Sequence, residues 1–333
     1  MRVVLDRSLF GTEQNHELFL SDLVGTVLRR GHRLGTRPEW GTPEATELLT
    51  RWAVGKSREH YRRLMTALNM QPAPWTGGSQ ELQLVVTASG SSSLPPKGRR
   101  LAMAATDEVI RFVETPLLVL VEDKRDDWNF LIRCVDSDWA DWLKKAVDGG
   151  WIKPDHGGGL GSIKRFVQQI LVDPQKWLRH FVLTDSDRPC PGDLMDEAYE
   201  IQKLCKDTVP HHALERRAIE NYVPEPALNR WAAGSPERLA WLADFRRLTD
   251  TQRHHFKLKQ GAEGGLARHG HHTHPSVQRL YGPLLTDSAH PLQKGPPGDL
   301  GALWSSGVQP SDLLPDSAAA ERRKIYRAIF EAI

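Results

Sequence analysis

Apolar residues along the chain follow two periodicities, which divide it into expected strands and helices. Four short segments are almost continuously apolar, as is typical of strands buried on both faces: 2–6, 82–88, 117–122 and 177–187. Segments with apolar positions at every third or fourth residue are expected to be helical: 16–30, 45–55, 57–68, 106–114, 128–150, 157–171, 193–206 and 317–333. Because such strands and helices alternate, the pattern predicts an α/β fold with a mainly parallel, Rossmann-like sheet between helices.

Loops rich in Pro, Gly and Ser interrupt the first third of the chain, at 70–80 and 89–98. The regular alternation of strand and helix begins only after these loops. We therefore expect an N-terminal α/β extension or partner-docking region at 1–110, a central domain at 111–265, and a mixed, mostly helical region at 266–333. The last helix, at 317–333, is a second candidate for docking a partner.

The composition is that of a globular protein, with 39% of the 333 residues hydrophobic and 26% charged. No apolar run reaches the roughly 18 residues of a membrane span, and the N-terminus has no apolar core of a secretion signal. Three widely spaced cysteines fit a reducing compartment. We therefore expect a cytoplasmic protein with no membrane partner. A net charge of +2 gives only weak non-specific attraction to nucleic acid, so any binding would depend on local basic clusters.

Acidic residues follow two of the expected strands directly. Glu122 ends the first, and Asp185 and Asp187 end the second in the segment "FVLTDSD". Side chains two apart in an extended chain point the same way, and the carboxyl ends of parallel strands meet at one edge. Grouped carboxylates repel one another unless a cation lies among them, which favours a Mg²⁺ or Mn²⁺ site. The alternative is that these acids cap turns and helices, with Asp123 or Asp126 capping the helix that begins at Asp127 and Asp187 capping a turn before Pro189.

These residues resemble the TOPRIM domain of topoisomerases, primases and OLD-family nucleases. In that family one strand ends in Glu within the pattern hhVEGxxD, and a later strand ends in DxD. Glu122, Asp126 and the pair Asp185 and Asp187 match these positions, although Asp123 stands where the family has Gly. The resemblance implies that Glu122, Asp126, Asp185 and Asp187 bind the metal, and that Glu122, Asp185 and Asp187 are also catalytic.

A second resemblance narrows the family to its OLD-like group. The segment "LERRAIENYVPEPAL" is similar to the ERRxIENYL segment of those proteins, and "HHFKLKQG" to their later lysine-bearing segment. By this resemblance Glu220 is an additional metal ligand, and Lys257 or Lys259 stabilises phosphate charge. No GxxxxGK[ST] phosphate-binding loop is present, so the resemblance implies a stand-alone chain that depends on a separate ATPase.

The function that these resemblances imply is metal-dependent cleavage of nucleic acid, with DNA preferred to RNA as the substrate. Arg216 and Arg217 would contact the nucleic-acid phosphates. The implied setting is defence of a bacterium against phage or other foreign DNA. A different class remains open: a non-catalytic subunit that binds nucleic acid or a partner within a larger complex. Homo-oligomerisation also remains open.

Overall fold

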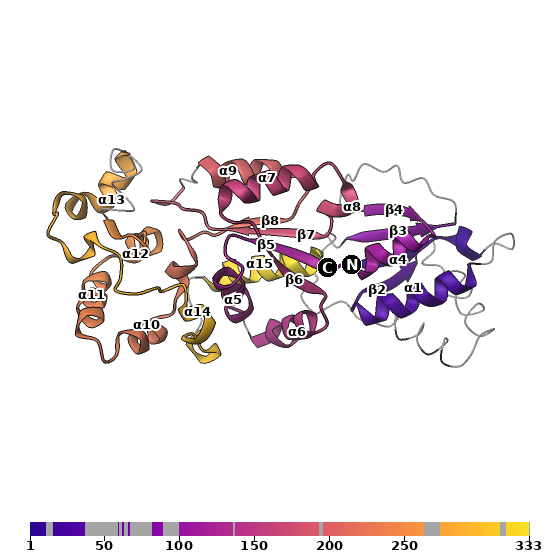
Figure 1. The fold of residues 1–333 in the computed structure, drawn as a ribbon, viewed down its shortest axis with the longest axis horizontal. Helices are drawn as coiled ribbons and strands as arrows, with labels where there is room; N and C mark the ends of the chain where they lie inside the picture. Colours follow the sequence, from indigo (N-terminus) through magenta and orange to yellow (C-terminus); the bar gives the residue numbers. More distant parts are fainter. Residues whose placement is uncertain are drawn as a thin grey trace.

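The computed structural model describes residues 1–10, 16–36, 59, 62, 66, 82–88, 100–135, 137–192, 196–262, 274–313 and 318–332. It is an α/β protein with two four-stranded sheets, and every described strand pairing is parallel (Figure 1). The predicted helices at 45–55 and 57–68 lie outside the described residues, apart from Glu59, Arg62 and Thr66, which are helical.

The first sheet has the strand order β2-β1-β3-β4. Val3 and Leu5 of its first strand share one apolar core with Leu23 and Val109 of the neighbouring helices. Helices α1 and α4 therefore cover this face of the sheet. The elements are β1 (Arg2–Leu5), η1 (Arg7–Phe10), α1 (Glu17–Arg29), β2 (Arg33–Thr36), β3 (Gln83–Thr87), β4 (Arg100–Ala104) and α4 (Asp107–Glu114).

The second sheet repeats this order as β6-β5-β7-β8, with strands β5 (Leu117–Val121), β6 (Ile152–His156), β7 (His180–Thr184) and β8 (His211–Ala213). Strand β5 pairs with β7 in the register Val119 to Phe181. The chain leaves β5 for β6 on one side and then crosses to β7 on the other. The strand order therefore switches direction between β5 and β7, where a parallel sheet opens a crevice at its carboxyl edge.

Both faces of the second sheet are buried. Val119 and Val121 pack against helices α5 (Asp126–Arg133), α6 (Ser137–Asp148) and α15 (Ala319–Ala332). Leu120 points the other way, into a core with helices α7 (Leu160–Ile170) and α9 (Asp196–Cys205). That second core also contains the apolar residues of the first sheet. The two sheets are thus joined by one continuous hydrophobic core.

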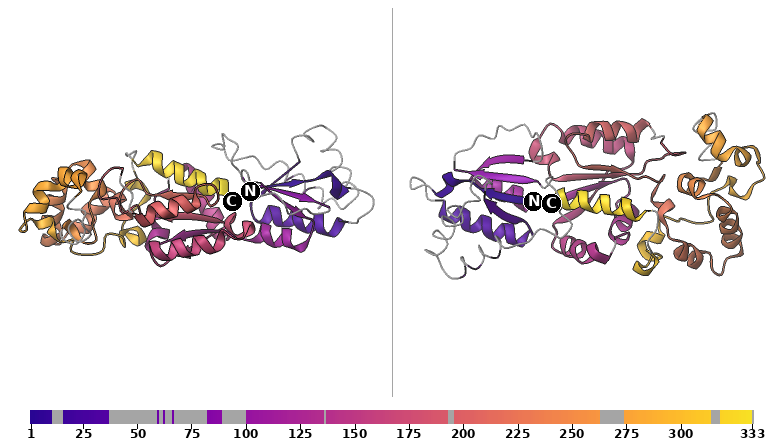
Figure 2. Two further views of the ribbon diagram at one scale, coloured as in Figure 1. Left: turned by 90° about the horizontal axis from the view of Figure 1, so that it is seen from above. Right: turned by 180° about the vertical axis from the view of Figure 1, so that it is seen from behind.

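Helices α10 to α13 form a helical end beyond the second sheet, and the three parts lie in a row along the long axis (Figures 1 and 2). The remaining elements are α8 (Pro174–Trp177), η3 (Ile219–Tyr222), α10 (Glu225–Ala232), α11 (Pro236–Arg246), α12 (Asp250–His255), α13 (Pro275–Thr286), η6 (Pro291–Gln293), α14 (Leu303–Ser306) and η7 (Pro310–Asp312).

The last predicted helix forms as α15, but its apolar face is used within the chain. Ile325, Tyr326 and Ile329 are buried in the core of the second sheet, and the Tyr326 hydroxyl donates to the Leu131 carbonyl at 2.6 Å. This face of α15 is therefore not free to dock a partner. Both chain ends lie between the two sheets, where the Leu82 amide donates to the Glu331 carbonyl (Figure 2).

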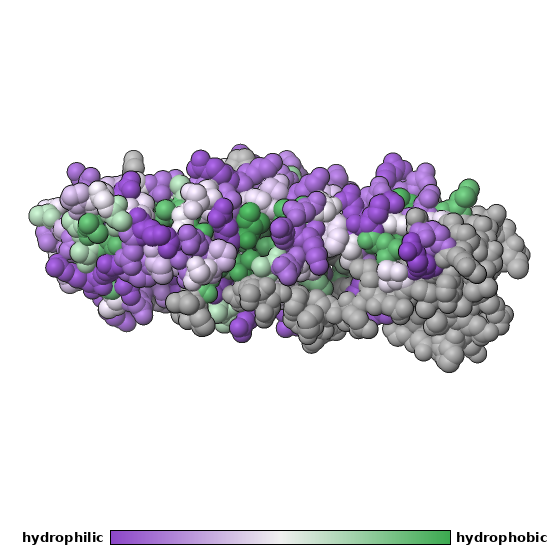
Figure 3. Space-filling view, turned by 90° about the horizontal axis from the view of Figure 1, so that it is seen from below, coloured by the Kyte–Doolittle hydropathy of each residue, from purple (hydrophilic) through white to green (hydrophobic). Residues whose placement is uncertain are grey.

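The surface of the described part is mainly hydrophilic where it is seen from below, with apolar residues in smaller areas between the polar ones (Figure 3). Among the helices that the structure describes, none has the length and apolar character needed to cross a membrane.

Candidate active site

Acidic side chains meet at the crevice between β5 and β7. Strand β5 ends at Val121 and is followed by Glu122, and β7 ends at Thr184 and is followed by Asp185. The Asp185 amide donates a hydrogen bond to Glu122 Oε1 at 3.2 Å. The parallel pairing of two buried strands therefore brings together Glu122 and Asp185, which lie 63 residues apart in the sequence.

Burial and mutual repulsion perturb these acids strongly. Burial, followed by the charges of Asp127 and Asp187, raises the pKa of Glu122 to about 8. The pKa of Asp185 is raised well above its ordinary value by burial of its carboxyl group and then by Glu122. Burial also raises the pKa of Asp127 to about 6. Such a cluster either retains protons near neutral pH or takes up a compensating cation.

Asp187 has an unusual backbone conformation that aims its side chain. Its φ of 49° lies in the left-handed region, which is costly for residues other than glycine. The amides of Ser186 and Asp187 hold it there by donating to the Arg217 carbonyl at 3.1 and 3.0 Å. The Asp187 carboxylate then lies 3.8 Å from Arg217 Nε and 3.9 Å from Lys257 Nζ.

The segment Ile219–Tyr222 closes the crevice from the helical end. The Ile219 amide donates to Asp185 Oδ1 at 3.2 Å. Asn221 fixes this turn, because its Oδ1 accepts from the Ala218 amide and its Nδ2 donates to the Phe256 carbonyl. The turn thereby carries the Glu220 side chain into the interior, where it is only 2% exposed.

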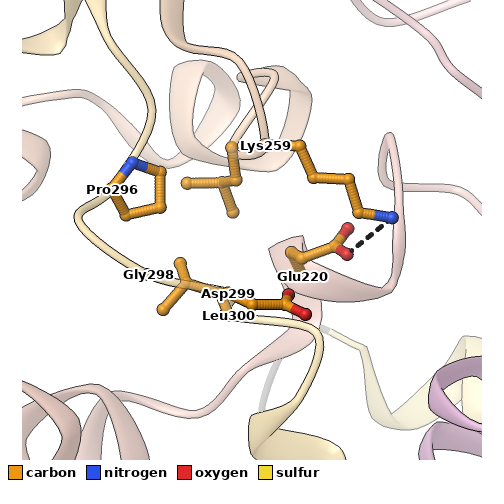
Figure 4. A pocket seen from close by; sticks show the side chains of 7 residues that line it. Glu220, Lys259, Pro296, Gly298, Asp299 and Leu300 are labelled. Carbon is orange, nitrogen blue, oxygen red and sulfur yellow. Dashed lines mark ion pairs between the residues drawn. The ribbon is translucent and has the colours of Figure 1, made fainter.

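Two lysines on the segment after α12, Lys257 and Lys259, lie next to these acids. Lys259 Nζ forms an ion pair with Glu220 Oε1 at 3.0 Å (Figure 4). Burial alone would lower the pKa of Lys259, but the carboxylates of Glu220 and Asp185 raise it above its ordinary value. Burial lowers the pKa of Lys257. Lys259 is half exposed, with 59% of its side chain accessible, so it can also reach a ligand.

The two predicted phosphate-binding arginines differ in their surroundings. Arg217 is 2% exposed, and it donates to the His255 carbonyl at 3.3 Å while facing Asp187. Arg216 lies nearer the surface, with its guanidinium 4.7 Å from the centre of the Tyr222 ring. Arg217 is thus placed to orient Asp187 from inside, and Arg216 is the more accessible of the two.

Two acids for which the sequence predicted no role, Asp127 and Asp299, belong to this region. Asp127 is 7% exposed, and after burial its charge contributes most to the raised pKa of Glu122. Asp126 forms an ion pair with Arg125. Consecutive residues at the start of a helix point about 100° apart, so Asp126 and Asp127 face different sides of α5. Asp299 is the second, and its loop is distant in sequence from every recognised motif.

A cavity of about 360 Å³ adjoins the acids (Figure 4). Glu220, Lys259 and Asp299 contribute its charged groups, and the carboxylates of Glu220 and Asp299 extend to the same side as the Lys259 ammonium. The remaining lining residues are Leu258, Pro296, Gly298 and Leu300. This part of the site combines charged groups with an apolar wall.

The chemistry of the donor set fits a hard divalent cation, which prefers carboxylate oxygens. Within the described ranges, however, no three Asp, Glu, His or Cys side chains are already arranged to hold a metal ion. Backbone amides occupy one oxygen of each of three carboxylates: the Asp185 amide donates to Glu122, the Ile219 amide to Asp185, and the Asp123 amide to Asp127. A cation would have to compete with these single hydrogen bonds.

Comparisons of the chain with protein-family models, with curated proteins and with solved structures found no match.

Proposed function

We propose that this protein is a metal-dependent nuclease of the TOPRIM type, which hydrolyses phosphodiester bonds in nucleic acid. The observation that carries the proposal is the meeting of Glu122, Asp127, Asp185 and Asp187 at the point where the strand order switches direction. Burial and repulsion raise the pKa of Glu122 to about 8 and that of Asp185 well above its ordinary value. A cluster of this kind is expected where a cation is to be bound.

Glu122, Asp185 and Asp187 would hold the Mg²⁺ or Mn²⁺ ion, with Asp127 beside them. When bound, such an ion lowers the pKa of water and neutralises charge on the phosphoryl group. Lys257 approaches this cluster through Asp187, at 3.9 Å. Lysine ammonium groups at this position would stabilise the negative charge that develops on phosphate oxygens during displacement.

The surrounding residues support recognition of the nucleic-acid backbone. The Lys259 side chain is 59% exposed beside the cavity, and Arg216 stacks on Tyr222 near the Asp185 loop. Both are suited to contacting phosphates, with DNA as the expected substrate. A role in bacterial defence together with a separate ATPase follows from the OLD-like resemblance and is part of the proposal.

The alternative is a non-catalytic subunit that binds nucleic acid or a partner. Binding of nucleic acid or a partner does not require grouped acids with raised pKa values, because such acids destabilise the folded protein when they ionise. The raised pKa values of Glu122 and Asp127 therefore favour the catalytic proposal.

Asp185→Asn tests the proposal, because it removes the ionisable carboxyl group while keeping the shape of the side chain. The purified wild type should cleave single- or double-stranded DNA with Mg²⁺ or Mn²⁺, and EDTA should stop the reaction. The variant should lose at least about 100-fold in rate, as when a group that stabilises transition-state charge is removed. Asp207→Asn, at an exposed position, is the matched control. Equal rates for the wild type and Asp185→Asn would contradict the assignment.

A further inference from the structure

We infer that Glu321 is a positioning residue of the proposed site, because it fixes the segment 212–222 that holds the acids of the crevice in place. Glu321 lies in the first turn of α15, outside the motifs of both resemblances. This role rests on the proposed nuclease function and deepens it. Glu321 acts through other residues, and the hydrogen bonds between them form a continuous chain from α15 to the acids.

Three donors surround the Glu321 carboxylate, which is only 2% exposed. The Glu215 amide donates to its Oε1 at 2.6 Å, and His212 Nε2 lies 2.8 Å from the same oxygen. The Tyr222 hydroxyl donates to its Oε2 at 2.5 Å. One carboxylate on the C-terminal helix therefore binds the segment 212–222 at both of its ends, although the partners lie 99 to 109 residues apart in the sequence.

The Tyr222 hydroxyl extends this contact into the middle of the segment. It accepts a hydrogen bond from the Arg216 amide at 2.9 Å while it donates to Glu321. Burial, followed by the charge of Glu321, raises the pKa of Tyr222 well above its ordinary value, so the hydroxyl keeps the proton that it donates. Glu321 thus fixes the backbone at Arg216 through Tyr222.

The backbone at residues 216 and 217 holds the loop that carries Asp187. The Arg216 carbonyl accepts a hydrogen bond from the Ser186 hydroxyl at 2.8 Å. The Arg217 carbonyl accepts from the amides of Ser186 and Asp187, whose left-handed conformation depends on these bonds. A displacement of the two carbonyls would therefore move the Asp187 carboxylate.

Asp185 and Glu220 depend on the other end of the same segment. The Ile219 amide donates to Asp185 Oδ1 at 3.2 Å, and Glu220 lines the cavity. Both residues 219 and 220 lie within three positions of Tyr222, so the bond between Tyr222 and Glu321 restricts their movement. Side chains that hold reacting groups in place in this way act through the bonds they make to the groups' neighbours.

The chemistry of Glu321 favours this role over packing alone. Burying a carboxylate is costly, and an apolar side chain of similar size would pack α15 against the sheet at least as well. The carboxylate adds three directed bonds, and all three go to the one segment that holds the acids.

Cleavage of a DNA oligonucleotide with Mg²⁺ tests the inference through kcat and KM. Glu321→Ala removes all three bonds, so it should lower kcat about 10- to 100-fold, the loss typical of residues that orient metal-binding groups. The KM should change less than about 2-fold, because the residues that contact DNA remain. Glu321→Gln keeps an oxygen that can accept from the Glu215 amide, and it should recover most of the wild-type kcat.

Tyr222→Phe decides the matter if Glu321→Ala does not fold, because it breaks only the link from Glu321 to Arg216. It should lower kcat about 10-fold. Tyr326→Phe is the matched control: it removes another buried hydroxyl that bonds α15 to the core, at the Leu131 carbonyl, and should lower stability while kcat stays unchanged. Circular dichroism should show which variants are folded at the assay temperature.

A purely structural role of Glu321 would lower the melting temperature and leave the kcat of the folded variants unchanged. Wild-type kcat in Tyr222→Phe and in folded Glu321→Ala would therefore overturn the inference and leave the proposed function intact. A wild type that cleaves no DNA would overturn both.

Discussion

Replacing Glu122 by Gln should stabilise the metal-free protein while removing its proposed activity. Glu122 is partly buried beside Asp127 and Asp187, and its carboxylate accepts a hydrogen bond from the Asp185 amide. A glutamine side chain has almost the same shape, and its amide oxygen can accept the same bond. The substitution therefore removes the unfavourable charge and little else.

The pKa of Glu122 gives the size of this effect. Its rise from 4.5 to about 8 corresponds to about 5 kcal/mol at pH values above the folded pKa, at about 1.4 kcal/mol per unit. At pH 7 the folded carboxyl is still mostly protonated, so the difference is about 3 kcal/mol. Both figures are upper limits, since Asp127 and Asp185 change their own protonation when Glu122 becomes neutral.

The direction of the pH dependence follows from the raised pKa. The folded protein binds a proton that the unfolded chain releases between pH 4.5 and about 8. The contribution of Glu122 is therefore fully present below pH 4.5 and is lost as the pH rises to about 8. Glu122→Gln has no carboxyl group to ionise at this position. The difference in free energy of unfolding between this variant and the wild type should therefore grow from pH 4.5 to about 8.

Urea denaturation followed by tryptophan fluorescence, in EDTA at pH 5 to 9, measures the difference. Glu237→Gln serves as the control for loss of one exposed acid. Adding Mg²⁺ should then stabilise the wild type more than Glu122→Gln, because only the wild type keeps the full set of carboxylates. The reasoning fails if Glu122→Gln is no more stable than the wild type at pH 8, or if the difference does not change with pH.

Two further predictions concern the scaffold. Tyr222→Phe should lower the free energy of unfolding by about 1–3 kcal/mol in urea titrations, because buried Glu321 loses the Tyr222 hydroxyl as a donor; an unchanged midpoint would contradict this. The truncated chain 111–333 should not unfold cooperatively, since the core on one face of the second sheet continues into the first sheet. A sharp transition for that chain would show instead that residues 1–110 are a separate module, as a docking region would be.

The sequence predicted the central strands better than the edge strands. Strands β1, β3, β5 and β7 are central in their sheets, and all four appear as nearly continuous apolar runs. Strands β2, β4 and β6 lie at edges and were not predicted. An edge strand is only partly covered, so it needs no such run, and Pro154 in β6 is tolerated because an edge leaves one side unpaired.

The same contrast applies to the candidate site. Glu122 and Asp185 could be placed together because they follow strands whose pairing is set by burial. Asp299 could not, because a loop without regular structure carries it, and its position depends on backbone contacts at Gly295 and Gly261. The burial of Arg217 also depends on tertiary packing, since "ERRAIENY" gives both arginines the same local character.

Two glutamates beside the second sheet, one buried and one partly buried, differ in the partners of their carboxyl groups. Burial alone would raise the pKa of Glu321, but His212, Tyr222 and the Glu215 amide all donate to it and hold its pKa below the ordinary value. Glu122 instead lies among other carboxylates, and its pKa is raised to about 8. The fold thus supplies three donors to the Glu321 carboxylate, whereas partial burial and acidic neighbours raise the pKa of Glu122, at the crevice of the same sheet. A general failure to satisfy partly buried acids would raise the pKa of both residues. The contrast therefore favours a specific role for Glu122, as the proposed function requires.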